Sequence, residues 1–199
     1  MDITEICNMA LARIGKAGIA SIKENSENAR QCALFYDFTR KKLLREYAWG
    51  FAKRTIKAAE LSAASPYWAH IYAYPQYCIA IRKIFSEGDA QAVNEGKEQE
   101  PWDLHMVSDG VLGIGCNVEK AWIEYTYDVL DADLFSADFL EALVHMLAFN
   151  ICQQLTGSAG MQQTEYQLAM NAITAAKFGS AKEKKQKPVY PTSYIDGRG

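Results

Sequence analysis

The residues of this chain that could carry chemistry are three histidines, a group of acidic side chains and five cysteines. An imidazole titrates near neutral pH and binds metals, so His70, His105 and His145 are the first candidates for an acid, a base or a ligand. None of them belongs to an HExxH pattern or to a similar metal-binding spacing. Glu141 lies one helical turn before His145, which favours a structural pair on one helix face. The histidines therefore predict neither a metal site nor a catalytic site.

The acidic side chains keep one enzymatic alternative open, a cell-wall or polysaccharide hydrolase. Two carboxylates at a fixed separation are enough for glycoside hydrolysis. Here the acidic residues gather between Glu119 and Glu141, in an expected strand and loop, and no single pair stands out. Gly110, Gly113 and Gly115 do not form a dinucleotide fingerprint, which requires a following helix, and Walker and GxSxG motifs are absent from the sequence. We therefore expect no catalytic residue, no cofactor and a protein that is not an enzyme.

The cysteines are odd in number and widely spaced: Cys7, Cys32, Cys78, Cys116 and Cys152. The sequence contains no CxxC pair, and no ligand spacing fits a zinc site. In a reducing compartment such cysteines are buried thiols that act as small hydrophobic residues. The sequence therefore predicts no metal-binding residues.

The composition predicts a globular chain without a membrane segment. Its 199 residues are 49% hydrophobic, which is ample for a core. The N-terminus lacks a basic segment followed by an apolar run, and no apolar stretch approaches the ~20 residues that cross a bilayer. We therefore expect synthesis in the cytoplasm and no membrane contact. A formal charge of −3 and a pI near 5.7 argue against wholesale nucleic-acid binding, which needs basic surfaces.

Charges of opposite sign are concentrated in two parts of the chain. Opposed patches of this kind suit subunits that meet side to side, although two ordinary solvated faces explain them equally well. The basic part contains one acidic residue, Glu46, among the basic residues Arg40, Lys41, Lys42, Arg45, Lys53, Arg54 and Lys57. The acidic part contains one basic residue, Lys120, among the acidic residues Glu119, Glu124, Asp128, Asp131, Asp133, Asp138 and Glu141.

The N-terminal part of the chain, from Asp2 to Arg54, predicts two amphipathic helices. Apolar residues recur at three- and four-residue steps in the first helix, and Gly15 suits its C-cap. The second helix starts near Asn25 or Ser26, either of which can cap it. Its apolar surface is broad, which indicates a second packing partner in this chain or in a neighbouring subunit. The first stripe comprises Ile3, Ile6, Cys7, Ala10, Leu11 and Ile14, and the second helix presents Ala29, Cys32, Leu34, Phe35, Tyr36, Phe38, Leu43, Leu44 and Tyr47.

The middle of the chain predicts a small antiparallel sheet, and helices return after it. Aromatic and β-branched residues indicate strands within 67–85, 102–107, 111–116 and 121–127, with a hairpin turn at Asp109-Gly110. A helix follows Ser136 and ends at Gly157, and another runs from about Ser158 to Phe178. We expect an α+β fold whose core is a four-helix bundle of two antiparallel helix pairs. The small β insertion, at about residues 66–128, interrupts a single domain of residues 1–187.

The last segment, residues 188–199, combines prolines with apolar residues. Pro188, Pro191 and Gly197 prevent regular structure. Tyr190, Tyr194 and Ile195 are apolar enough to need a packing site, which a purely solvated tail would not require. We therefore interpret the segment as an extended C-terminal arm that contacts another molecule, the alternative being a frayed terminus.

Aromatic and cationic residues alternate where the second helix ends. The sequence there is Tyr47-Ala48-Trp49-Gly50-Phe51-Ala52-Lys53-Arg54. Trp49, Phe51 and Arg54 are candidates for contacting a neighbouring subunit. Simple core packing is an equal alternative for the two aromatic residues. Nothing in this segment is placed for chemistry, so it indicates an assembly part.

Two segments of the N-terminal part resemble the tail tubular protein A family of short-tailed bacteriophages, also called head-to-tail adaptors. The resemblance rests on Glu5-Ile6-Cys7-Asn8-Met9-Ala10-Leu11-Ala12-Arg13-Ile14-Gly15 and on Ser26-Glu27-Asn28-Ala29-Arg30-Gln31-Cys32, followed by Leu43-Leu44-Arg45-Glu46-Tyr47 and Trp49. It covers nearly the whole chain, loosely in the middle. The resemblance implies a structural virion protein that joins the portal to the tail nozzle as a ring, usually a dodecamer. It carries no catalytic signature.

The resemblance also implies partners and a location. The partners are further copies of the chain, the portal protein and the tail nozzle protein, and the location is the head–tail junction of the virion. The arm would dock on a neighbouring subunit or on the portal, and DNA would pass through the ring during ejection without sequence-specific contact. The cations that could meet its phosphates are Arg40, Lys41, Lys42, Lys182, Lys184, Lys185 and Lys187. The acidic total favours a DNA-repelling channel instead.

Overall fold

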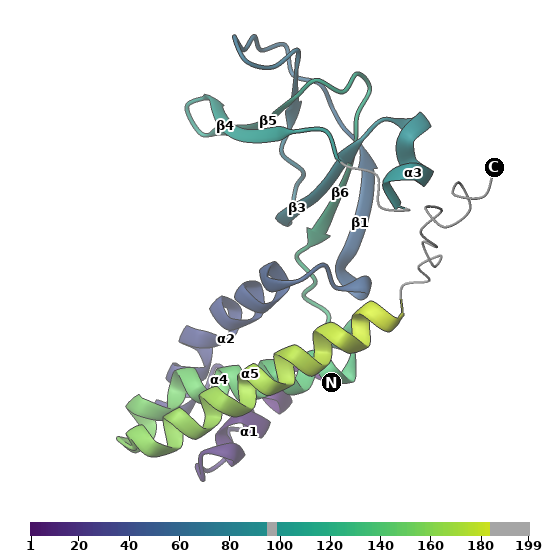
Figure 1. Ribbon diagram of the computed structural model, residues 1–199. Coiled ribbons are helices and arrows are strands. Elements are labelled where there is room, and N and C mark those ends of the chain that lie inside the picture. The colour runs from purple at the N-terminus through teal and green to yellow at the C-terminus, as the bar shows by residue number, and fades with distance from the viewer. Residues whose placement is uncertain (95–98, 184–199) are drawn as a thin grey trace, which may run out of the picture.

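The computed structural model describes residues 1–94 and 99–183, which form helices at both ends and strands between them (Figure 1). The α helices are Ile3–Arg13 (α1), Glu27–Glu46 (α2), Ala90–Asn94 (α3), Ala137–Thr156 (α4) and Ala159–Lys182 (α5). The strands are Lys53–Lys57 (β1), His70–Ala73 (β2), Cys78–Phe85 (β3), Trp102–Ser108 (β4), Val111–Cys116 (β5) and Trp122–Tyr127 (β6). Short 3-10 helices cover Gly50–Ala52 (η1), Glu87–Asp89 (η2) and Ala132–Leu134 (η3). The fold is therefore α+β.

Local hydrogen bonds fix both ends of α1. Asp2 and Glu5 form a capping box, in which each side chain accepts a hydrogen bond from the main-chain nitrogen of the other. At the other end Gly15 has a φ of +67°. The main-chain nitrogens of Gly15 and Lys16 donate to the carbonyls of Ala12 and Leu11, which is the Schellman arrangement. The C-cap predicted at Gly15 is confirmed.

Serine side chains cap the N-termini of the three long helices. Ser26, Ser136 and Ser158 each accept a hydrogen bond from the main-chain nitrogen three residues further on, at the starts of α2, α4 and α5. Gly157 ends α4 with a positive φ, as the sequence predicted. None of the helices formed by the described residues is long and apolar enough to span a membrane.

The predicted four-helix-bundle core is wrong. Helix α4 is the centre of the helical layer, and α1, α2 and α5 pack against it, whereas α1 and α2 barely touch each other. The reason lies in α4, whose residues 142–148 are all buried, so that one central helix takes three partners. The broad apolar surface of α2 is only partly covered within the described chain. Its Leu34 and Phe38 are 66% and 59% exposed and face no other helix of the described chain.

Two three-stranded antiparallel sheets, with the orders β1-β6-β3 and β2-β5-β4, replace the single small sheet that was predicted. They have a hydrophobic cluster of their own, which includes Tyr72, Ile84, Ile114 and Ile123. This second core explains why the molecule is not a bundle with a minor insertion. Strand β1 was missed because its five residues are all exposed and carry no apolar alternation.

The hairpin turn predicted at Asp109-Gly110 is confirmed, since Gly110 has a φ of +76° and joins β4 to β5. Helix α3 lies between the predicted strands of 67–85 and 102–107, where the sequence predicted neither a helix nor a strand. The domain limits proposed from the sequence, 1–187 with an insertion at about 66–128, stay predictions. The predicted arm, residues 188–199, lies outside the described residues.

Candidate functional site

The segment after α2 leaves the helix at Tyr47, whose backbone is extended. The indole of Trp49 lies against the end of α2, where its Nε1 donates a hydrogen bond to the main-chain oxygen of Leu43 at 2.8 Å. That carbonyl belongs to the last turn of α2. Trp49 is 1% exposed, so core packing is the role that the structure supports for this residue.

Four aromatic rings meet where this segment passes the start of α4. The ring centroids of Trp49 and Phe139 are 5.1 Å apart, and those of Phe51 and Phe139 are 5.0 Å apart. Phe135 completes the group, at 5.0 Å from Phe139. Edge-to-face contacts of this kind add to the stabilisation that burial gives. Phe51, the second aromatic candidate, stays half-buried at the edge of the group.

Arg40 joins α2 to the chain that follows β6. It is fully buried, and its Nη1 donates to Asp128 Oδ1 at 2.5 Å and to the Val129 main-chain oxygen at 2.6 Å. Its Nη2 donates to Asp37 Oδ1 at 3.0 Å. Burial opposes the charged guanidinium, but these hydrogen bonds outweigh it and raise the pKa of Arg40. Arg40 was predicted to face DNA, and the structure corrects this, because the side chain reaches no surface.

Arg82, on β3, joins the sheet to the end of α2. Its Nη2 donates to the main-chain oxygens of Leu44, Arg45 and Tyr47 at 3.1, 2.9 and 2.8 Å. Its Nε donates to Thr126 Oγ1 on β6 at 2.8 Å. A cation at this position caps the free carbonyls of the helix and lies at the negative end of its dipole. Arg40 and Arg82 together fix the helical layer to the sheet β1-β6-β3.

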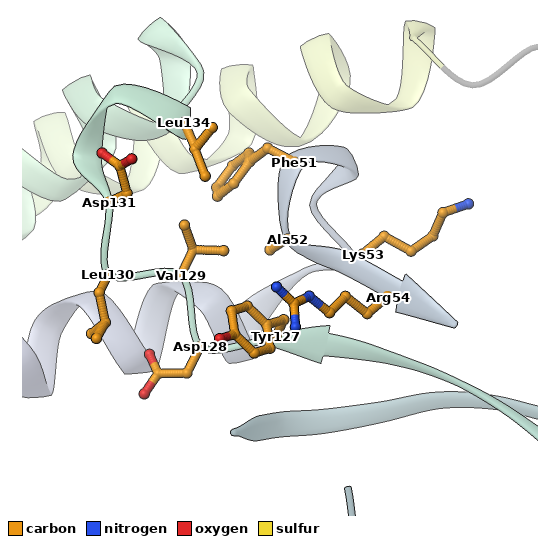
Figure 2. A pocket seen from close by; sticks show the side chains of 10 residues that line it. All are labelled: Phe51, Ala52, Lys53, Arg54, Tyr127, Asp128, Val129, Leu130, Asp131 and Leu134. Carbon is orange, nitrogen blue, oxygen red and sulfur yellow. The ribbon is translucent and has the colours of Figure 1, made fainter. Parts of the chain in front are cut away.

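A hollow of about 290 Å³ lies at the same junction (Figure 2). One wall comes from the segment Phe51–Arg54 and the other from the chain between β6 and η3. Arg54 places its guanidinium carbon 3.3 Å from the ring centroid of Tyr127, a cation–π contact. The lining residues are Phe51, Ala52, Lys53, Arg54, Tyr127, Asp128, Val129, Leu130, Asp131 and Leu134. Arg54, a predicted contact residue, is exposed at this rim.

The other predicted DNA-facing cations are dispersed. Lys41 pairs with Asp37 at 3.3 Å and lies 3.9 Å from Asp128 Oδ2. Lys42 is exposed on α2, and Lys182 is exposed at the end of α5. Lys184, Lys185 and Lys187 lie outside the described residues, as do the arm residues Tyr190, Tyr194 and Ile195. The described cations therefore form no single phosphate-binding surface.

His145 and His70 have carboxylate partners within the fold. His145 Nδ1 lies 2.7 Å from Glu165 Oε2 in the buried interface of α4 and α5, and Arg13 of α1 lies 3.4 Å from the other oxygen. Glu141, the partner expected from the sequence, is exposed instead. His70 pairs with Glu60 at 2.8 Å on the surface. His105 is half-buried on β4.

The acidic residues of the hollow are engaged structurally. Arg40 and Lys41 contact the two oxygens of Asp128. Asp131 caps η3 by accepting a hydrogen bond from the main-chain nitrogen of Asp133 at 3.0 Å. In residues 1–94 and 99–183, no group of three or more His, Cys, Asp or Glu side chains could hold a metal ion. The five cysteines are free thiols, all buried except the half-buried Cys78.

Sequence reasoning missed Arg82 and the hollow residues Tyr127, Leu130 and Leu134. One signal was present for Arg82, a charged residue within the apolar run of β3. No signal pointed to the hollow, because its two walls are about 75 residues apart in the chain and meet only in the fold.

A scan of protein-family models finds none that matches this chain, and a search of curated proteins finds no match either.

Proposed function

We propose that this chain is a structural assembly protein, the head-to-tail adaptor of a short-tailed bacteriophage. It would form a ring between the portal and the tail nozzle and line part of the DNA channel. The proposal rests on the resemblance of the N-terminal segments. One structural observation supports it most: large apolar side chains remain uncovered on two outer helices of the helical layer.

These uncovered side chains lie on α2 and α5, and both helices pack against α4, the helix between them. On α2, Leu34 and Phe38 are 66% and 59% exposed. On α5, Tyr166, Met170 and Phe178 follow one side at four- and eight-residue steps and are 37%, 40% and 65% exposed. Two different apolar faces on one subunit suit a head-to-tail contact, in which the α2 face of one copy meets the α5 face of the next. Such contacts close into rings when the rotation between copies allows it.

Part of the charge complementarity that the sequence suggested is used within the subunit. Lys53 lies 3.7 Å from Glu124, and Arg40 lies 2.5 Å from Asp128. The opposed charges therefore stabilise the fold first. This leaves the apolar faces as the stronger basis for contact between subunits, because exposed ion pairs contribute little.

The test is assembly of the full chain on the portal ring of the same virus, followed by sedimentation and electron microscopy. Phe38→Asp and Phe178→Asp should each prevent ring formation, because each places a charge in one half of the contact. Mixing the two variants should give dimers, since one intact contact remains between them. Tyr67→Asp, at a residue that is 83% exposed outside both faces, is the matched control and should assemble normally.

Failure of the unmodified chain to bind a portal ring would refute the adaptor proposal. Normal rings from both aspartate variants would refute the two-face arrangement alone. A hydrolase would show itself differently, by turnover of peptidoglycan that one Asp or Glu substitution abolishes. Contact with passing DNA would appear as weak binding that salt removes.

A further inference from the structure

Strands β1 and β4 each leave one outer edge open within the described chain (Figure 1). Each has a neighbouring strand on one side only, β6 for β1 and β5 for β4. The other two end strands are covered, since residues 59–61 pair with β2 and β3 has no exposed residue. All five residues of β1 are exposed, as are Asp103, Leu104, Met106 and Ser108 of β4. An open edge presents unpaired main-chain groups to which another strand can add.

On β1, the main-chain groups that point outward are those of Thr55 and Lys57. Successive residues of an antiparallel pair turn these groups alternately toward the partner strand and away from it. The Ala58 nitrogen donates to the Ala121 carbonyl at 2.8 Å, which continues the pairing of β1 with β6 by one residue. Thr55 and Lys57 therefore turn away from β6.

On β4, the outward main-chain groups belong to Leu104 and Met106. The Leu104 nitrogen donates to the carboxylate of its own neighbour, Asp103, at 2.8 Å, so it takes no part in the pairing with β5. By the same alternation Met106 also points outward, whereas His105 between them faces β5.

The two open edges carry opposite charge. Strand β1 has three basic residues and no acidic one. Residues 100–109, which contain β4, have three acidic residues and no lysine or arginine. Lysines on an edge hinder its pairing with a second basic edge, whereas opposite charges on neighbouring strands stabilise pairing. The two edges end different sheets and do not pair with each other within the subunit, so the complementary edge is that of another copy.

We propose that β1 of one copy pairs with β4 of a second copy, in parallel, with Thr55 opposite His105. In a parallel pair a residue bonds the two residues that flank its opposite one, so an outward-facing residue lies opposite an inward-facing one. Thr55 and His105 meet this condition. The main-chain groups of Thr55 then bond those of Leu104 and Met106, which are the free groups of the β4 edge.

The side chains agree with this register on both faces of the joined sheet. Ile56 lies opposite Met106, and these side chains are 37% and 64% exposed in the single subunit. Each belongs to the face of its sheet that carries residues of the second core. On the other face Lys53 lies opposite Asp103. An antiparallel pairing would instead set Ile56 against Asp103 or His105.

The inference goes beyond the adaptor function, because the pairing needs a second copy and no portal. Its test is a disulfide cross-link between two tagged forms of the full chain, both with Cys78→Ser. Ile56→Cys in one form and Met106→Cys in the other should give a mixed dimer under mild oxidation at high concentration. Thr55→Cys in place of Ile56→Cys is the matched control. Its yield should be about tenfold lower, because successive side chains point to opposite faces of a strand.

The contribution of charge is tested in the same mixture. Asp103→Lys in the Met106→Cys form should lower the yield about fivefold, because it places a second cation opposite Lys53. Asp109→Lys makes the same change of charge outside the residues that face β1, and should leave the yield within about twofold.

Each outcome decides the proposal. A mixed dimer that exceeds the Thr55 control and falls with Asp103→Lys supports it. A Thr55 yield equal to that of Ile56 or above it would overturn the parallel register. Equal losses from the two lysine variants, or no mixed dimer above either form oxidised alone, would overturn the pairing of these edges. Portal binding of the unmodified chain tests the adaptor function separately.

Discussion

The guanidinium of Arg82, on β3, donates a hydrogen bond to the main-chain oxygen of Tyr47, the C-cap of α2, at 2.8 Å. The same nitrogen reaches the carbonyls of Leu44 and Arg45. One side chain of the sheet thus satisfies carbonyls that no residue within α2 can satisfy. These hydrogen bonds fix the end of α2 relative to β3. They also fix the position at which the aromatic segment begins, Tyr47.

Replacing Arg82 with methionine should destabilise the protein by about 2–3 kcal/mol, because several carbonyls lose a charged donor while the aliphatic stem is kept. Urea unfolding followed by tryptophan fluorescence measures the loss. The neighbouring Lys83→Met is the control, since the hydrogen bond that Lys83 makes to a described residue is long, 3.5 Å to the main-chain oxygen of Val93. An equal loss from both variants would contradict the capping role of Arg82.

Acid should weaken the protein through Asp37. Burial opposes the charge of this carboxyl, but hydrogen bonds from Arg40 and Lys41 hold its pKa below the ordinary 3.8. A carboxyl with a lowered folded-state pKa contributes stability above its unfolded pKa, and that contribution is lost as the pH falls through the folded value. The unfolding free energy of Asp37→Asn should therefore fall less steeply than that of the unmodified protein below about pH 4. If the unfolding free energies of the two proteins fell in parallel from pH 6 downward, this linkage would be contradicted.

The buried contact between His145 and Glu165 should be far more important for stability than the surface position of Glu141. Glu165→Leu removes the carboxylate that pairs with His145 and with the partly exposed Arg13, and should cost about 1–3 kcal/mol, because it leaves the buried imidazole without its partner. Glu141→Leu lies one turn from the same histidine but is exposed, and should change stability by less than about 0.5 kcal/mol. Thermal unfolding of the two variants decides between the contact in the fold and the one expected from the sequence.

Local features of this fold could be predicted from the sequence, but the way in which its helices and strands pack together could not. The Gly15 cap and the Asp109-Gly110 turn depend on neighbouring residues, so their signals are complete in a short window. The central position of α4 was visible only as a long, largely apolar stretch interrupted by His145 and Asn150, and the helices of a bundle also contain such stretches. Strand β1 has no alternation of its own and is held by its pairing with β6.

The candidate site was harder to predict for the same reason. Arg40 was read as a surface cation because the residues around it are basic. Its partners, Asp128 and Val129, lie 88 and 89 residues further along the chain. The sequence singled out Trp49 and Phe51 together. Only the packing of α4 against them determines that Trp49 is buried and that Phe51 is half-buried.

Cys78 should be the first thiol to react with an alkylating reagent. It is half-buried, whereas Cys7, Cys32, Cys116 and Cys152 are 0% exposed. Burial raises the pKa of Cys78, so its alkylation should be slow at neutral pH and accelerate above the ordinary thiol pKa of about 8.5. Mass spectrometry of the native protein should find modification at this residue alone, and all five cysteines should react in denaturant. Early labelling of a buried cysteine would indicate local opening of the helical layer.

Gly115 should tolerate no side chain, because the Trp68 indole occupies the space that a Cβ would need. Gly115→Ala should destabilise the sheet β2-β5-β4 by about 1–3 kcal/mol through overpacking. Gly160→Ala is the matched control. Nothing lies within 4 Å of an added Cβ there, and alanine is the better helix former, so it should be neutral or stabilising by up to about 1 kcal/mol. Adding Trp68→Leu should recover part of the Gly115→Ala loss, because the smaller side chain makes room, and this non-additivity identifies the steric cause. Urea denaturation of the two single variants and the double variant measures all three effects.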